Sequence, residues 1–145
     1  MCSRLREAPA GTFDSALVAY GWNLNSQAAL PVLLECQARD IEFHVAGVLY
    51  FGGYGNLFDP AKAPAELQTK LAQWATLGQT HGGFSVHELA IAFSQLPYGA
   101  KTVLGMATAG EVDQNIAICQ KAADVPRALW KEAQAAGLLA PEIPL

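Results

Sequence analysis

Charged side chains are scarce in this chain, and the positive ones do not cluster anywhere along it. Only 15% of the 145 residues are charged, nine Lys and Arg stand against thirteen Asp and Glu, and the net charge is −4. Nucleic acids and anionic membrane surfaces attract proteins through clustered positive charge, so neither is an expected partner. The hydrophobic content of 52% instead permits one large core and argues against a disordered chain.

The sequence also lacks a long apolar run and any metal-ligand spacing. Its longest apolar runs are too short to span a bilayer. Residues 1–11 (MCSRLREAPAG) contain two Arg but not the apolar core of a secretory signal, and we expect them to form a disordered N-terminal tail. Cys2, Cys36 and Cys119 are odd in number and scattered, so no metal site is expected. We interpret them as reduced thiols of a cytoplasmic protein.

Strand-like and helix-like segments alternate over residues 12–145, a length typical of one domain. Strands joined by helices pair in parallel, and we expect them to be covered on both faces. Three parallel strands cannot close a barrel, so the sheet is either very small or part of a larger one. The predicted strands are 13–20, 41–49 and 101–104. Five helices are predicted between and after them: one that ends near residue 39, one from 64 to about 78, one that begins at a capping box of Ser85 with Glu88, one that begins after Thr108, and one from 126 to 137.

The stretch 101–120 (KTVLGMATAGEVDQNIAICQ) is the part of the chain most suggestive of a site. A short buried strand ends at Gly105, and Thr108 with Glu111 has the spacing of a capping box at a helix start. One apolar helix face then follows, formed by Val112, Ile116 and Cys119. A strand that leads into a capped helix makes an anion pocket, because free N–H groups and the helix dipole point at one place. An ordinary strand-to-helix turn explains the same pattern.

The segment VLGMATAGEVDQN (103–115) resembles the last strand and following helix of the aldo-keto reductases. Further segments are similar to that family in the same order, and the closest subgroup is its aldose and fucose dehydrogenase-like branch. They are YGWNLNSQAALPVLLE (20–35, sixth strand exit and helix), ARDIEFHVAGVLYFGG (38–53, seventh strand and phosphate loop), HGGFSVHELAIAF (81–93) and VPRALWKEAQAAGLL (125–139). The resemblance covers about residues 12–140. It implies an α/β fold that is a partial (β/α)8 TIM barrel, about strands six to eight with their helices.

The resemblance also implies a cofactor, NAD or NADP, and the residues that hold it. In the family, a Gly, a small hydroxyl residue and an acid or amide followed by Asn hold the adenosine end, and the phosphate loop has a Leu and a Gly. The matching or adjacent positions here are Leu49, Gly52, Gly105, Thr108, Glu111, Gln114 and Asn115. Residues 106–115 contain no Arg or Lys to bind a 2′-phosphate, whereas the Glu111 carboxylate can accept a ribose hydroxyl, so NAD is favoured. Val48 and Phe51 depart from the residues common in the family's loop.

The catalytic residues that the family uses are not matched in this chain. Its Asp, Tyr, Lys and His belong to earlier strands of the barrel, and a typical barrel needs about 250 residues. His44, His81 and His87 are interpreted as packing or surface residues, because a histidine without an oriented partner is a weak catalytic candidate. No catalytic residue is therefore predicted, and whether the chain is an enzyme stays open.

Three functional interpretations follow. In the first, the chain is the cofactor portion of a reductase that transfers hydride between nicotinamide and an aldehyde or sugar hydroxyl, and it needs a complementary barrel half. In the second, it is a non-catalytic fragment that binds nucleotide weakly or pairs with itself. A small flavodoxin-like nucleotide domain is the third, although residues 20–23 do not form its phosphate loop. We expect the isolated chain to dimerise or to be only partly folded, because its parallel strands have exposed edges.

Overall fold

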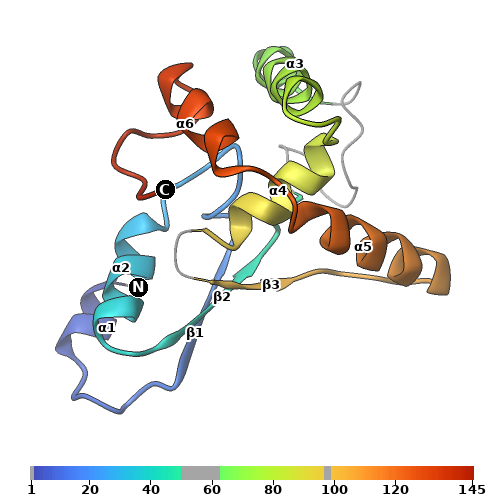
Figure 1. Cartoon of the computed structure of the whole chain (residues 1–145). Helices are drawn as coiled ribbons and strands as arrows, with labels where there is room; N and C mark the ends of the chain where they lie inside the picture. The colour runs from blue at the N-terminus through green and yellow to red at the C-terminus, as the bar shows by residue number, and fades with distance from the viewer. Residues whose placement is uncertain (1, 50–62, 97–98) are drawn as a thin grey trace.

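The computed structural model describes residues 2–49, 63–96 and 99–145, in which helices and strands alternate (Figure 1). The α/β class is confirmed, and the predicted elements are present with shorter strands than the sequence indicates. In chain order they are α1 (Cys2–Glu7), β1 (Ser15–Ala19), α2 (Leu30–Ala38), β2 (Glu42–Ala46), α3 (Ala65–Thr80), α4 (Val86–Ser94), β3 (Lys101–Val103), α5 (Ala109–Ala122) and α6 (Arg127–Ala135).

The three strands form one parallel sheet in the order β1-β2-β3. Ala16 is paired with Phe43, and Val45 is paired with Thr102. The tight connection from α2 to β2 depends on Asp40, which has a φ of 56° and lies just beyond the helix end. Its N–H donates to Gln37 O (3.3 Å), and the N–H of Ile41 donates to Cys36 O (2.8 Å), the pattern of a Schellman motif. Asp tolerates this left-handed conformation better than most residues, so helix and strand can follow each other directly.

Within the described part of the chain, helices cover only one face of the sheet. Phe43 and Val45 point to the covered face and are buried, whereas Leu17 and Val103 point to the other face and are 49% and 42% exposed. The expectation that both faces are covered is therefore wrong here. The reason is topological: each strand pairs with the next in sequence, and right-handed crossovers then place every connecting helix on the same side.

Four aromatic side chains hold the helical layer together. Trp22, after β1, stacks on Phe93 of α4 with ring centroids 5.0 Å apart, and its Nε1–H donates to Leu96 O at 3.0 Å. Phe93 lies 5.9 Å from Trp130 of α6, which in turn lies 6.3 Å from Trp74 of α3. All four are buried. Segments far apart in sequence therefore share one core, and α3 and α6 lie beside each other at the top of Figure 1.

The N-terminal segment differs from the expected disordered tail. Residues 2–7 form α1, and the side chain of Leu5 is buried in the core. Arg6 Nε donates to Glu35 Oε2 at 2.8 Å, and Arg39 Nη2 donates to Ala8 O at 2.6 Å, so both ion pairing and hydrogen bonding join this segment to α2. A helix this short has too few residues for periodicity to reveal it, and tertiary contacts rather than intrinsic propensity stabilise it.

Candidate functional site

Two of the predicted cofactor residues, Leu49 and Gly105, follow the ends of β2 and β3. Ala46 is paired with Val103, so the chain leaves both strands at the same edge of the sheet. Leu49 follows β2 by three residues, is half-buried and packs against the core. Gly105 follows β3 by two residues and is exposed. Gly52 lies outside the described residues. We call this place, where Leu49 and Gly105 begin the connections that follow β2 and β3, the strand-exit edge.

The capping box at the start of α5 is confirmed. Thr108, with an extended backbone, accepts the N–H of Glu111 on its Oγ1 at 3.2 Å. Glu111 Oε2 in return accepts the N–H of Ala107 at 2.6 Å and of Thr108 at 3.3 Å. These bonds satisfy N–H groups that a helix start leaves without an internal partner. The carboxylate of Glu111 thus occupies part of the place where an external anion would bind.

The two amide residues of α5 point in different directions. Asn115 is 9% exposed and faces into the protein, whereas Gln114 is exposed. Val112 and Ile116, expected on the apolar side of this helix, are 39% and 51% exposed. The prediction of that apolar face is wrong for these two residues because α5 packs against α4 through a different side, on which Asn115 and Ala122 are buried.

Steric space is available around Gly105. A Cβ added to this residue would meet no atom within 4 Å, and its φ lies outside the left-handed region. Neither the packing of the chain nor its backbone conformation therefore requires glycine here. A residue without a side chain at an exposed strand exit lets a ligand approach the main chain closely.

A charged cluster that the sequence analysis missed lies on the uncovered face of the sheet. Glu42 Oε1 is 2.5 Å from His44 Nε2, and its other carboxylate oxygen accepts a hydrogen bond from Lys101 Nζ. Residues 42 and 44 share a face because side chains alternate along a strand. Lys101 joins them through register, since its Cα is paired with that of His44. The alternation was visible in the sequence, but the register was not.

Removing the lysine of this cluster should raise the pKa of the Glu42 carboxyl. Hydrogen bonds from Lys101 and, to a lesser extent, His44 lower that pKa below its ordinary value of 4.5. A lowered pKa in the folded state adds stability above the ordinary pKa that is lost as the pH falls through the lowered one. We expect Lys101→Met to move the pKa towards 4.5 and to flatten this acid dependence. Carbon-13 NMR of the Glu42 carboxyl against pH measures the shift.

The matched control for this prediction is His44→Leu. It should raise the pKa of Glu42 by less than Lys101→Met does, because His44 is the weaker of the two causes. An unchanged Glu42 pKa in Lys101→Met would show that the pair does not persist in solution. The ion pair is exposed, so its effect on overall stability is expected to be small.

The other histidines and the described cysteines offer no catalytic arrangement. His81 Nε2 lies 2.8 Å from Glu132 Oε2 and joins the end of α3 to α6. Partial burial lowers the pKa of His87 and raises the pKa of the Cys119 thiol, which disfavours the charged form of each. Neither Cys36 nor Cys119 forms a disulfide. Among the described side chains, no cysteine or histidine both lies at the strand-exit edge and has a pKa shift that favours its reactive form.

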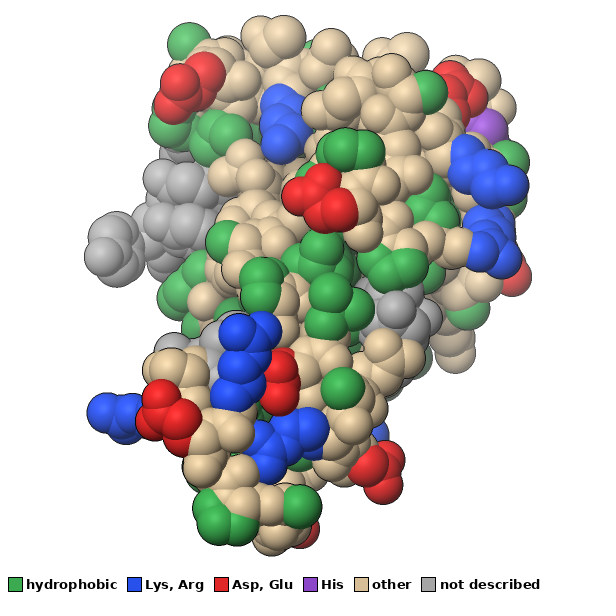
Figure 2. Space-filling view, turned by 90° about the vertical axis from the view of Figure 1, so that its left-hand side faces the viewer, with side chains coloured by type: hydrophobic (Ala, Val, Ile, Leu, Met, Phe, Trp, Pro, Cys, Tyr) green, Lys and Arg blue, Asp and Glu red, His purple; other side chains and the backbone are tan. Residues whose placement is uncertain are grey.

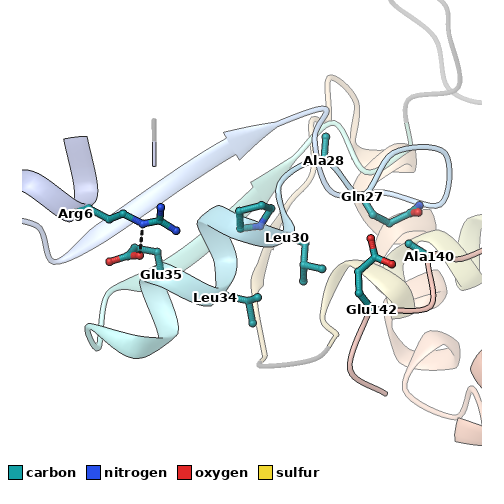
Figure 3. A pocket seen from close by; sticks show the side chains of 9 residues that line it. Arg6, Gln27, Ala28, Leu30, Leu34, Glu35, Ala140 and Glu142 are labelled. Carbon is teal, nitrogen blue, oxygen red and sulfur yellow. Dashed lines mark hydrogen bonds and ion pairs between the residues drawn. The ribbon is translucent and has the colours of Figure 1, made fainter. Parts of the chain in front are cut away.

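A cavity lies elsewhere, between α1, α2 and the C-terminal segment (Figure 3). Its volume is about 590 Å³, and apolar side chains of α2 form much of its wall, with the Arg6–Glu35 ion pair at one end and Glu142 near the other. Figure 2 shows hydrophobic side chains across the middle of one side of the molecule, above mixed charges. A second cavity of about 490 Å³ is lined by Asp14, Asp40 and Lys101 near the starts of the strands. No predicted cofactor residue lines either cavity.

The described residues were also compared with the requirements of a metal site and of a membrane-spanning helix. Among them, no three His, Cys, Asp or Glu side chains come together as a possible metal site. None of the helices within residues 2–49, 63–96 and 99–145 combines the length and apolar character that crossing a membrane requires.

Neither a protein-family model nor a curated protein matches the chain.

Proposed function

We propose that this chain is the cofactor-binding, C-terminal portion of an aldo-keto reductase-like barrel, and that it binds NAD at the strand-exit edge without transferring hydride by itself. The observation that carries the proposal is the sheet of three sequential parallel strands, covered on one face, with Gly105 and the capped start of α5 directly after the last strand. In open and closed α/β folds alike, ligands bind at the carboxyl ends of the parallel strands.

One-sided cover favours a barrel portion over a doubly wound sheet. A doubly wound sheet reverses its strand order and has helices on both faces, whereas barrel strands follow one another with every helix outside. Here the order does not reverse. The uncovered face carries Leu17, Ala46 and Val103, and side chains of this kind fill the interior of such barrels.

The charges at the start of α5 favour NAD over NADP. Glu111 accepts the main-chain N–H groups of Ala107 and Thr108, so a 2′-phosphate there would meet a carboxylate and would have to displace it. A ribose hydroxyl can instead donate to a carboxylate. Residues 106–115 contain no Arg or Lys to compensate the phosphate charge.

The positions of the described histidine and lysine nearest the strands support a chain that does not transfer hydride by itself. His44 and Lys101 share the uncovered face, but both contact Glu42 at the opposite end of β2 from the strand-exit edge. Glu42 and Ala46 are four positions apart along β2, a distance of about 13 Å. A general acid must lie within hydrogen-bond reach of the reacting group, and this cluster does not meet that condition for a ligand at Gly105.

Titration of the full chain with NADH and NADPH, followed by nicotinamide fluorescence and calorimetry, tests the proposal. We expect saturable binding of NADH, weaker binding of NADPH, and no turnover with aldehyde substrates. Gly105→Leu should abolish NADH binding while leaving thermal unfolding unchanged, because no atom lies within 4 Å of the added Cβ.

The matched control is Ala38→Leu, which adds an exposed leucine at the end of α2, towards the other edge of the sheet. It should bind NADH like the parent chain. Failure of the parent chain to bind either nucleotide would contradict the function, and binding by Gly105→Leu equal to the parent's would contradict the placement of the site.

A further inference from the structure

We propose that the cavity between α1, α2 and the C-terminal segment binds a small organic amine, with the ammonium group at Glu142 and the apolar body against α2. The cavity has a volume of about 590 Å³, which lies within the range of about 300–1,000 Å³ that small-molecule sites occupy. No residue of the proposed nucleotide site lines it. The inference therefore goes beyond nucleotide binding and does not depend on it.

Apolar side chains of α2 give the cavity a wall that can hold a hydrocarbon body. Leu30 and Leu34 are about one helical turn apart, roughly 6 Å along the axis, and Pro31 lies between them in sequence. Leu30 is buried, whereas Leu34 is 40% exposed although its side chain is large and apolar. Ala140 of the C-terminal segment lines the cavity as well. An aliphatic ligand here would remove the exposed surface of Leu34 from water, which is favourable.

One end of the cavity, where Gln27 and Glu142 lie, offers hydrogen-bond acceptors (Figure 3). Gln27 Nε2 donates to Asn23 O at 2.9 Å and to Leu24 O at 3.3 Å. Because carbonyl oxygens only accept, these bonds fix the orientation of the amide and leave Gln27 Oε1 as an acceptor. Within the described part of the chain, neither this oxygen nor the Glu142 carboxylate has a hydrogen-bond or ion-pair partner. An ammonium group, which carries only donors and a positive charge, matches both.

The main chain on both sides of Glu142 is held in place by α6 and by the core. Gln134 Nε2 of α6 donates to Ala140 O at 3.1 Å and to Ile143 O at 2.8 Å. The N–H of Ile143 donates to Ala140 O at 3.2 Å, and the Ile143 side chain is buried. The Glu142 side chain therefore starts from an anchored turn, so less conformational freedom is lost when a ligand binds there.

The other end of the cavity disfavours an anionic ligand. Arg6 Nε donates to Glu35 Oε2 at 2.8 Å, so these two charges compensate each other. Glu142 then gives the cavity lining one net negative charge, in a chain whose own net charge is −4. A carboxylate ligand would compete with Glu35 for Arg6 and would be repelled by Glu142, whereas an ammonium would neutralise the lining. Charge complementarity therefore favours a ligand with a single positive charge.

Titration of the full chain with hexylamine, hexanol and hexanoate, followed by amide chemical shifts in NMR, tests the proposal. The three probes share an unbranched alkyl body and differ in the charge of the head group. We expect saturable binding of hexylamine, with shifts concentrated at residues 27–35 and 140–143. Hexanol should bind roughly fivefold more weakly, and hexanoate more weakly still. Equal affinities for hexylamine and hexanol, shifts concentrated elsewhere, or no binding would each overturn the proposed site.

Variants separate the roles of the charge and of the apolar wall. Glu142→Gln should weaken hexylamine binding roughly fivefold and leave hexanol binding unchanged, because it removes the charge but keeps the side-chain shape. The matched control is Glu66→Gln, the same change at an exposed glutamate in the first turn of α3, which should bind both probes like the parent chain.

Leu34→Lys should weaken hexylamine binding roughly tenfold or more, because it places a positive charge in the wall beside the ligand. Val112→Lys introduces the same residue at a side chain 39% exposed on α5, and it should bind hexylamine like the parent chain. Circular dichroism checks that each variant is folded. Equal losses in Glu142→Gln and Glu66→Gln, or full hexylamine binding by Leu34→Lys, would contradict the assignment of the ligand to this cavity.

Discussion

Phe93→Ala should lower the free energy of unfolding by about 3–5 kcal/mol, which is among the largest losses that a single truncation causes. Phe93 is fully buried and lies between two indole rings, with centroid distances of 5.0 Å to Trp22 and 5.9 Å to Trp130. Removing its ring leaves a cavity where the segment after β1, α4 and α6 meet. The rigid neighbours cannot close it, so both the lost burial and the empty space contribute to the cost.

The matched control is Phe13→Ala, the same substitution at a side chain that is 41% exposed just before β1. It should cost about 1 kcal/mol or less, since little apolar surface leaves the core. Urea unfolding followed by circular dichroism measures both variants. Domains of this size are stable by about 5–15 kcal/mol, so Phe93→Ala should unfold at a markedly lower urea concentration. Equal losses in the two variants would show that the aromatic cluster does not hold the helices together.

Interactions between residues close in sequence could be predicted from the sequence alone. Ser85 with Glu88 and Thr108 with Glu111 form complete capping boxes, as their three-residue spacing indicates. Both the donor and the acceptor lie within one turn, so no distant part of the chain decides the outcome. The same locality explains why the existence and order of the strands, and of every described helix except α1, could be predicted.

Features that depend on packing between distant residues could not be predicted in this way. Lys101 and Glu42 are 59 residues apart, and only the register of β2 with β3 brings them together. The buried side of α5 is fixed by α4, which leaves Ile116 exposed despite its apolar spacing. Sequential strand order likewise uncovers one face of the sheet, although a parallel strand alone indicates cover on both.

The candidate site combines both kinds of feature. The position of Gly105 after a strand and before a capped helix was visible as a local pattern, and its exposure is consistent with an approach by a ligand. The engagement of Glu111 with the main chain follows from the same local pattern. In contrast, the packing of α5 against α4 decides that Asn115 is buried and Gln114 is exposed. Two residues that are adjacent in sequence therefore do not face the same ligand.

Gly78→Ala and Gly110→Ala, identical changes inside two helices, should shift stability in opposite directions. In α3, a Cβ on Gly78 would lie 2.2 Å from the carbonyl oxygen of Phe84. The carbonyl of Gly78 also accepts the N–H groups of Gly83 (3.1 Å) and Phe84 (3.0 Å), so the chain after α3 folds back directly onto the helix. Main chain cannot rotate away as a flexible side chain can, so the added methyl group must break this contact.

We expect Gly78→Ala to destabilise the protein by about 1–3 kcal/mol, as overpacking of a well-packed core does. In α5, a Cβ on Gly110 meets nothing within 4 Å, and alanine there should stabilise by up to about 1 kcal/mol because the unfolded chain loses freedom. Urea unfolding of the two single variants and the double variant measures both effects, which should add because the sites share no contact. A stabilising Gly78→Ala would mean that residues 83 and 84 do not pack on α3 in solution. Since helix propensity alone favours alanine at both positions, only the close approach of Phe84 to α3 predicts opposite signs.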